Sequence, residues 1–213
     1  MKYKMIAFDL DGTLLDTLPD LVEATNHTLK EMNRPLRNRE EVRISIGHGL
    51  VTLLEKTSDA SKEEIEQFIK GFLEYYGSHA NVKTIPYQGM KEVLEDLKQK
   101  GYILVVATNK DEDIAKEMIE YHFPGLFIDV AGYNYQREGK PSFDMFKDLL
   151  DKHNLTKEDL FFLGDSDVDA ETIIKNDLDG CLVTWGFKTK EELKPYQLDK
   201  IDRVEDIITI VEK

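Results

Sequence analysis

Two aspartates, Asp9 and Asp11, directly follow the first apolar segment of the chain, Met5–Phe8. Alternate side chains of an extended segment point to the same side, so we expect the two carboxylates to lie close together. Such a pair repels unless a proton or a cation lies between its members, and Mg²⁺ usually binds one or two carboxylates together with substrate phosphate. Gly12 would let the backbone turn and bring its amides near an anion. An ordinary Asp-Gly turn is the alternative for this segment alone.

Further polar groups that could take part in chemistry lie in the second half of the chain. Thr108 and Asn109 precede a helix that we predict to begin near Asp111, and donors at a helix N-terminus can bind phosphate. Capping of that helix is the alternative role for either residue. Lys140 follows a polar loop and precedes another predicted helix, a place where solvated lysines are also common.

A cluster of acids stands directly after the strongly apolar segment Leu160–Leu163. Its members are Asp165, Asp167 and Asp169. Capping of the following helix would explain one of these acids, but it explains all three less well. The cluster therefore favours a functional site at this segment.

These groups can meet only if the fold brings the ends of several segments together. Short apolar runs, typical of strands buried on both faces, alternate with amphipathic helical segments. This alternation predicts βαβ units and an α/β fold with a parallel sheet covered by helices on both faces. Open sheets of this kind bind ligands at the carboxyl ends of their strands. The predicted strands are Met5–Phe8, Ile103–Ala107, Leu126–Val130, Leu160–Leu163 and Cys181–Thr184.

Residues 16–86 interrupt the alternation, because only helical periodicity is found there. Apolar stripes with helical spacing run through 18–32 and 65–76, the second despite Gly71, which costs about 1 kcal/mol in a helix interior. The sequence Thr17-Leu18-Pro19-Asp20 is typical of a capping box at a helix start. We therefore predict an all-helical cap without strands at 16–86.

The cap divides the rest of the chain into two pieces of one α/β core. These pieces are residues 1–15 and 87–213. The two crossings between cap and core, near Leu15–Leu18 and Val82–Tyr87, would act as hinges.

Taken together, the four polar segments resemble the signature of the haloacid dehalogenase superfamily of phosphotransferases. The matching residues are Asp-x-Asp-Gly-Thr at 9–13, Thr-Asn at 108–109, Lys-Pro at 140–141 and Gly-Asp-x-x-x-Asp at 164–169. The match spans nearly the whole core and is specific because all four pieces occur in order. The resemblance implies a Rossmann-like core with a helical cap inserted after the first motif.

The resemblance also implies a role for each residue in phosphoryl transfer. Asp9 would attack phosphorus to give an aspartyl-phosphate, which water then hydrolyses. Asp11 would act first as general acid and then as base. Thr108 and Lys140 would hold the transferring phosphoryl group and offset its charge. Gly12 and Asn109 are further candidates for phosphate binding.

The same resemblance implies a magnesium site. Mg²⁺ would be bound by the carboxylates of Asp9 and Asp165 and by the main-chain carbonyl of Asp11, with Asp169 supporting it from nearby. An acid at position 11 favours phosphate ester chemistry, because dehalogenases and phosphonate-cleaving members lack one there.

One loop of the cap bears on the substrate. Gly47-His48-Gly49 resembles the Gly-x-Gly loop in the caps of phosphoglycolate phosphatases, and His48 would bind a substrate carboxylate or phosphate when the cap closes. A helix-start loop with an incidental histidine is an equal alternative. Arg43 and Lys56, on either side, are expected to be solvated.

Two segments depart from that subgroup. Lys140-Pro141-Ser142-Phe143 replaces the frequent Lys-Pro-x-Pro, and residues 133–139 form a loop that we expect on the surface. The alternative is that Tyr133, Tyr135 and Arg137 of this loop face the cleft. The predicted function is a magnesium-dependent phosphatase for a small, phosphoglycolate-like phosphomonoester. A phosphomutase of the β-phosphoglucomutase type and an inorganic pyrophosphatase are the alternatives.

Composition limits the partners. The chain has 42 acidic and 28 basic residues and a net charge of −14, which argues against nucleic acid or an anionic membrane surface as partner. The single cysteine, Cys181, excludes an intrachain disulfide. No stretch approaches the roughly 20 apolar residues of a membrane span, and the first apolar run is too short for a signal peptide. We expect a cytoplasmic monomer or homodimer.

Overall fold

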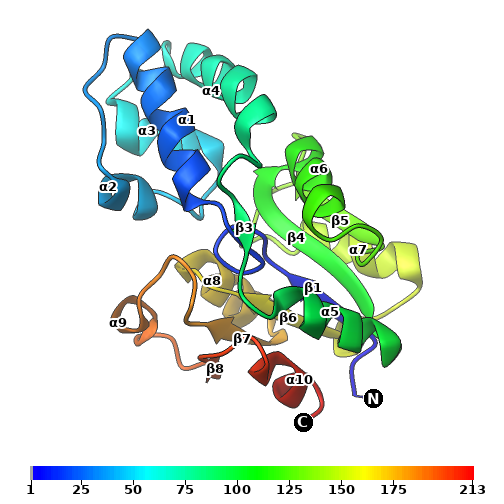
Figure 1. Cartoon of the computed structure of the whole chain (residues 1–213). Helices are drawn as coiled ribbons and strands as arrows, with labels where there is room; N and C mark the ends of the chain where they lie inside the picture. The colour runs from blue at the N-terminus through cyan, green and yellow to red at the C-terminus, as the bar shows by residue number, and fades with distance from the viewer. Residues whose placement is uncertain (1) are drawn as a thin grey trace.

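A six-stranded sheet forms the centre of the computed structural model, which describes residues 2–213 (Figure 1). The strand order is β5-β4-β1-β6-β7-β8, and every neighbouring pair is parallel. The chain moves outward from β1 through β4 and β5, and then returns to β6 on the other side of β1. The strands are β1 Met5–Phe8, β4 Ile103–Asp111, β5 Asp129–Tyr133, β6 Leu160–Gly164, β7 Asp179–Val183 and β8 Lys200–Ile201.

Alternation along the strands gives the sheet two apolar faces. In β1, Ile6 and Phe8 belong to one buried cluster, whereas Met5 and Ala7 belong to the other. The first face is covered by α5 (Met90–Gln99), α6 (Glu112–His122) and α10 (Asp206–Val211), and the second by α7 (Asp144–His153), α8 (Asp167–Asn176) and α9 (Lys190–Leu193). The predicted Rossmann-like class, with helices on both faces of a parallel sheet, is confirmed.

One predicted strand is displaced along the chain. Leu126–Val130 was expected to be a strand, but β5 begins only at Asp129, which pairs with Val105 of β4. The apolar residues before it pack onto the sheet from a loop, and the ring of Phe127 lies 6.0 Å from that of Phe8. The apolar character of Leu126 and Phe127 therefore indicated packing against the sheet, although these residues are not part of the strand.

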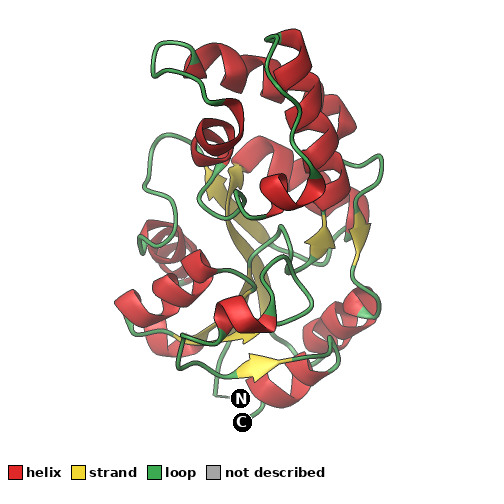
Figure 2. Ribbon diagram, turned by 90° about the vertical axis from the view of Figure 1, so that its left-hand side faces the viewer, coloured by secondary structure: helices red, strands yellow, loops and turns green. Residues whose placement is uncertain are grey.

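Four helices lie together beyond the carboxyl ends of the central strands (Figures 1 and 2). They are α1 Leu18–Glu31, α2 Arg39–Arg43, α3 Leu50–Ser58 and α4 Ile65–His79. The two predicted stripes form α1 and α4, which pack against each other. Gly71 lies at this contact, because a Cβ there would be 3.6 Å from Thr28 and 3.8 Å from Met32. An added Cβ would make ordinary van der Waals contacts at these distances, so the close approach of the two helices does not depend on the glycine.

The prediction that 16–86 contains no strand is wrong. Two short strands, β2 (Leu15–Asp16) and β3 (Ile85–Pro86), form an antiparallel ribbon, so the two crossings between the helices and the sheet lie side by side. Strands of two residues are too short to show alternation in the sequence, which is why the pattern gave no sign of them.

The predicted capping box at 17–20 is also wrong. Thr17 precedes α1 without a side-chain cap, and its hydroxyl instead donates to the Asp11 carboxylate at 2.6 Å. Asp20 is buried and accepts hydrogen bonds from the backbone amides of Lys83 and Thr84 and from the Thr84 hydroxyl, at 2.8–3.0 Å. Both polar residues therefore hold the crossing segments together and do not cap the helix. Within the part of the chain that is described, no helix has the length and apolarity to cross a membrane.

Candidate active site

Three buried carboxylates meet where the strand order of the sheet reverses. Asp9 follows β1, Asp165 follows β6, and Asp169 lies in the first turn of α8. One oxygen atom from each of the three lies within 4.8 Å of the others. The ammonium group of Lys140 donates to Asp9 Oδ1 at 2.7 Å and to Asp169 Oδ1 at 2.6 Å. Sequence reasoning predicted these four residues as one site, and the structure brings them together.

The loops around Asp165 hold its carboxylate in place. Oδ1 accepts from the Thr13 hydroxyl at 3.2 Å, and Oδ2 accepts from the Phe187 amide at 2.6 Å. Gly12 has a φ of +86°, and a Cβ at this position would overlap the Asp165 carboxylate. Gly12, predicted to bring amides near an anion, therefore serves first to let the turn pass close to Asp165.

Asp169 joins the start of α8 to the rest of the site. Its Oδ2 accepts from the amides of Asp165 and Ser166 and from the Ser166 hydroxyl, at 3.1, 3.0 and 2.6 Å. Ser166 and Asp169 together form the capping box of this helix. One acid of the cluster therefore does cap the helix, and through its other oxygen the same acid holds Lys140.

The charges at this point are not balanced among the described residues. Burial and the neighbouring Asp169 raise the pKa of Asp9 to about 6, against the opposing effect of Lys140. Burial, Asp169 and Asp9 raise the pKa of Asp165 well above its usual value. Burial lowers the pKa of Lys140, but the charges of Asp169 and Asp9 outweigh it and raise the net value. One ammonium group among three buried carboxylates leaves an excess of negative charge, and such hard oxygen donors fit a divalent cation such as Mg²⁺.

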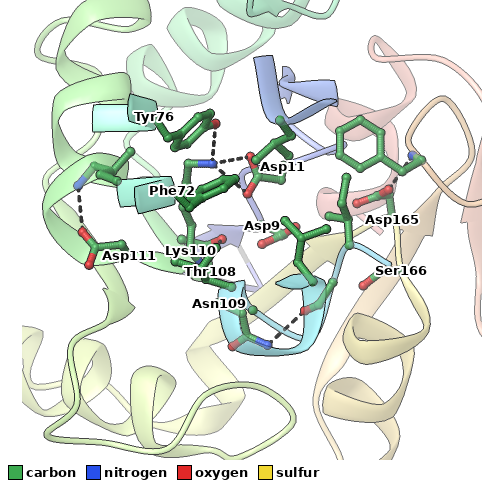
Figure 3. A pocket seen from close by; sticks show the side chains of 18 of the residues that line it. Asp9, Asp11, Phe72, Tyr76, Thr108, Asn109, Lys110, Asp111, Asp165 and Ser166 are labelled. Atoms are coloured by element: carbon green, nitrogen blue, oxygen red, sulfur yellow. Dashed lines mark hydrogen bonds and ion pairs between the residues drawn. The ribbon is translucent and has the colours of Figure 1, made fainter. Parts of the chain in front are cut away.

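Asp11 lies on the side of the site that faces the cap helices (Figure 3). Its carboxylate accepts from the Lys110 ammonium group at 2.9 and 3.1 Å and from the Thr17 hydroxyl at 2.6 Å. Lys110 also donates to the hydroxyl of Tyr76 in α4 at 2.8 Å. The sequence analysis gave Lys110 no role. Its position directly after Thr108-Asn109 was a signal, but its main partners lie 99 and 34 residues away along the chain.

β4 carries Thr108 and Asn109 into the site through an irregular stretch. Its pairing with β5 shifts register between Ala107 and Asp111, and interruptions of this kind redirect side chains next to active sites. Thr108 is buried and lines the cavity described below. Neither Thr108 nor Asn109 caps α6, since Asp111 accepts from the first amides of that helix.

The Asn109 side chain links two other segments of the site by hydrogen bonds. Its Nδ2 donates to the carbonyls of Gly47 and Lys140, at 3.1 and 3.0 Å, and its Oδ1 accepts from the Lys140 amide at 2.6 Å. Both N–H groups are used, so Asn109 joins the cap loop to the Lys140 segment in this arrangement. The sequence signal could not distinguish this bridge from a phosphate ligand.

A cavity separates the sheet edge from the cap helices (Figure 3). Asp9, Asp11 and Asp165 lie on its core side. The cap side is formed almost wholly by apolar residues and glycines, with one hydroxyl from Tyr76: Leu21, Ile46, Gly47, Gly49, Leu50, Leu53, Phe72, Leu73 and Tyr76. The cavity is therefore lined by carboxylates on its core side and by mostly apolar side chains on its cap side.

Arg43 differs from its predicted environment, whereas His48 lies beside a second cavity. His48 Nε2 lies 3.4 Å from the Asp167 carboxylate, and the residue lines a cavity that Lys140 also lines. Arg43 was expected to be solvated, but it donates to the Phe187 carbonyl and pairs with Glu192 of the core at 3.1 Å. Lys56 is exposed, as predicted.

The 133–139 loop is only partly the surface loop that was predicted. Tyr135 is 70% exposed, yet Tyr133 and Tyr135 both line the cavity that contains His48. Arg137 is largely buried between Glu112 and Asp148. Its contacts are with helices of the core, so it anchors the loop and does not face solvent.

Comparisons with known proteins agree with this site. The sequence profile described as haloacid dehalogenase-like hydrolase matches residues 6–183. Phosphoglycolate phosphatases from Aliivibrio fischeri and Haemophilus influenzae are 32% and 34% identical over 207 and 200 residues; the matches cover 93% and 87% of this chain and 91% and 88% of the relatives.

Solved structures have the same fold over the full chain. The crystal structure of a "predicted phosphoglycolate phosphatase" from Haemophilus somnus 129PT is 30% identical, covers 99% of both chains and has a TM-score of 0.92. The aligned region contains both the buried carboxylates of the site and the cap helices. The chain therefore belongs to the haloacid dehalogenase-like hydrolase family.

Proposed function

We propose that this protein is a magnesium-dependent phosphatase that transfers the phosphoryl group of a small phosphomonoester to Asp9. The observation that carries the proposal is the buried group of Asp9, Asp165, Asp169 and Lys140 at the floor of a cavity. A nucleophilic carboxylate beside an ammonium group and a cation site has the charges that phosphoryl transfer requires.

Asp9 is well placed to act as the nucleophile. Its Oδ1 is bonded to Lys140, which orients the carboxylate, and Asp9 itself lines the cavity. Its Oδ2 has no hydrogen-bond partner among residues 2–213, so it is free to attack phosphorus. The product would be an aspartyl-phosphate, which water hydrolyses in a second step.

Lys140 and Thr108 would hold the phosphoryl group. The ammonium group of Lys140 would stabilise negative charge on the oxygens next to Asp9, and the buried Thr108 lines the same cavity as Asp9. Fixed donors in a buried site of this kind stabilise the transition state more than they would in water.

The carboxylates of Asp9 and Asp165 would bind Mg²⁺, with Asp169 beside them and the Asp11 main-chain carbonyl as a further oxygen ligand. When bound, the cation would neutralise the charge that the transferring phosphoryl group shares with these carboxylates. The three acids support this assignment because their oxygens converge and their charges exceed that of Lys140.

Asp11 would transfer the proton. It lines the same cavity as Asp9, and it would donate a proton to the departing oxygen and then accept one from the attacking water. Residues 16–86 would form the cap domain that excludes water during this step, and 1–15 with 87–213 the catalytic core.

The relatives named phosphoglycolate phosphatase support a phosphoglycolate-like substrate. The test is phosphate release from 2-phosphoglycolate, pyrophosphate, β-glucose 1-phosphate and p-nitrophenyl phosphate, with Mg²⁺ or a chelator. We expect turnover of a monoester with Mg²⁺ only, and none by the Asp9→Asn variant. Formation of glucose 6-phosphate in place of free phosphate would favour the mutase, and preference for pyrophosphate the pyrophosphatase. No release from any phosphoester would refute the proposal.

A further inference from the structure

A buried ammonium group joins the proton-transfer residue to the cap. The Lys110 side chain is 6% exposed. It donates to both oxygens of Asp11, at 2.9 and 3.1 Å, and to the Tyr76 hydroxyl at 2.8 Å. Asp11 belongs to the loop after β1, Lys110 to the end of β4, and Tyr76 to α4 of the cap (Figure 3). The contact therefore links three separate parts of the chain at one nitrogen atom.

On the cap side, the link ends at the hydroxyl of Tyr76. Tyr76 is 1% exposed and carries the single polar side chain among the cap residues that line the cavity. Burial raises its pKa to about 12, so its hydroxyl stays neutral, and the Lys110 ammonium group also lies 4.6 Å from the centre of its ring. Tyr76 therefore offers both an acceptor oxygen and an aromatic ring to one cation.

On the core side, Lys110 provides two of the three side-chain hydrogen bonds to the Asp11 carboxylate. Without Lys110, the described partners of the Asp11 carboxylate reduce to the Thr17 hydroxyl on Oδ1. A carboxylate held by one oxygen can rotate, whereas the bond from Lys110 to each oxygen fixes the plane of the group. Proton transfer depends on a heavy-atom distance of about 2.6–3.2 Å, so small rotations of the carboxylate would slow it.

We propose that Lys110 is a positioning residue that holds the Asp11 carboxylate toward the leaving group and connects it to the closed cap through Tyr76. This inference rests on the proposed function, because it matters only if Asp11 transfers a proton. It predicts that the proton donor is in place only when α4 of the cap lies against the end of β4.

The alternative role of Lys110 is direct binding of an anionic group of the substrate. The two roles predict different kinetics. A positioning residue affects substrates according to how much their leaving group needs a proton. A direct ligand affects the KM of the substrates that carry the extra anion.

The experiment compares Lys110→Met with the wild type on phenyl phosphate and p-nitrophenyl phosphate, which have nearly the same shape. Phenolate needs protonation to leave far more than p-nitrophenolate does. We expect kcat/KM for phenyl phosphate to fall about 100-fold, and that for p-nitrophenyl phosphate less than about 10-fold, since general acid catalysis contributes roughly 10²–10⁴-fold. Melting temperatures with Mg²⁺ verify that each variant is folded.

Two further variants complete the design. Tyr76→Phe keeps the ring and the Lys110–Asp11 pair but removes the acceptor for Lys110, so it should show the same preference for the better leaving group with a smaller loss, about 3- to 10-fold on phenyl phosphate. It also provides the test if Lys110→Met does not fold. Lys116→Met is the matched control, because this lysine lies on the outside of α6 and pairs with Glu112; its kinetics should equal those of the wild type.

Three outcomes would overturn the inference. Equal losses on both aryl phosphates would mean that Lys110 does not act through proton transfer. A rise in KM confined to 2-phosphoglycolate would identify it as a ligand of the substrate carboxylate. Unchanged kinetics in Tyr76→Phe would remove the connection to the cap. A wild type that hydrolyses no phosphoester is a different result, since it refutes the proposed function itself.

Discussion

The core and the cap contribute opposite kinds of surface to one cavity. The core contributes the carboxylates of Asp9, Asp11 and Asp165, and Asp9 is bonded to the buried Lys140. The cap contributes apolar side chains from α1, α3 and α4 and one tyrosine hydroxyl. Backbone amides donate to the carboxylates of Asp165 and Asp169, which helps the core to hold several charged groups close together.

The two regions are joined by several polar contacts. Lys110 bonds to Tyr76, Asn109 bonds to the Gly47 carbonyl, and Arg43 pairs with Glu192. Further contacts join Thr17 to Asp11, His48 to Asp167 and Asn81 to His122. The rest of the boundary on the cap side is largely apolar. This contrast suggests a division of work, in which the core performs the chemistry and the cap determines when water and substrate have access to it.

The largest expected effect is at the centre of the core. Asp9→Asn should lower kcat by about 10³-fold or more, because it removes the nucleophile. The same variant should be more stable than the wild type without metal, by about 1–3 kcal/mol near neutral pH, because the raised pKa of Asp9 means that its charge is unfavourable in the folded state. Phosphate release and urea unfolding measure the two effects. A destabilised variant would mean that the bond to Lys140 outweighs burial.

Because of the excess negative charge at the site, the stabilisation of the protein by Mg²⁺ should depend on pH. Burial raises the pKa of Asp9 from 3.8 to about 6, so the contribution of Asp9 to the stability of the metal-free protein falls as pH rises through this window. Mg²⁺ competes with protons for these carboxylates, and it should therefore raise the melting temperature more at about pH 7 than at about pH 5. Equal shifts at both pH values would argue against binding at this site.

Trp185 offers a second readout of the metal site that does not require turnover. It is the single tryptophan of the chain. Its indole donates to the Thr13 carbonyl at 3.1 Å, and the Thr13 hydroxyl donates to Asp165. Its fluorescence should change when Mg²⁺ is added, and the change should be lost in Asp165→Asn.

On the side of the cap, the largest stability effect is expected at Asp20. Asp20→Ala leaves the buried amides of Lys83 and Thr84 without their acceptor, and we expect a loss of about 2–4 kcal/mol in the free energy of unfolding. Urea denaturation measures it, with the exposed Asp113→Ala as control. A loss below about 0.5 kcal/mol, the usual range for surface sites, would mean that water replaces these bonds.

The smallest effect is expected at Arg43. Its partners Glu40 and Glu192 are partly exposed, so Arg43→Ala should cost about 0.5–1 kcal/mol or less. Since the residue joins cap and core, the variant should raise KM more than it lowers kcat, and added salt should reduce the difference from the wild type. A fall in kcat equal to that of Lys110→Met would contradict the division between chemistry and access.

The core site could be predicted from the sequence because its residues stand at fixed places on a regular fold. Asp9 and Asp165 each follow an apolar run, and the carboxyl ends of parallel strands meet at one edge. The contacts of Lys110 could not be predicted in this way. They depend on how α4 lies over β4, which follows from packing between segments far apart in the chain and not from any local pattern.

The errors in the prediction have the same cause. Thr17 and Asp20 have the spacing of a capping box. In the folded chain, however, Thr17 donates to Asp11 and Asp20 accepts from Thr84. A sequence pattern indicates which hydrogen bonds a side chain could form. The residues that lie close to it in the folded structure determine which of these bonds are made.

The short ribbon of β2 and β3 has an evolutionary consequence. Because Leu15 pairs with Pro86, the chain leaves the core and returns to it at one point. Insertions whose ends lie close together disturb a host fold little. The helices between these residues could therefore be lengthened, replaced or exchanged for those of another lineage while the sheet and its acids stay intact, so that new substrate preferences could arise without rebuilding the catalytic machinery.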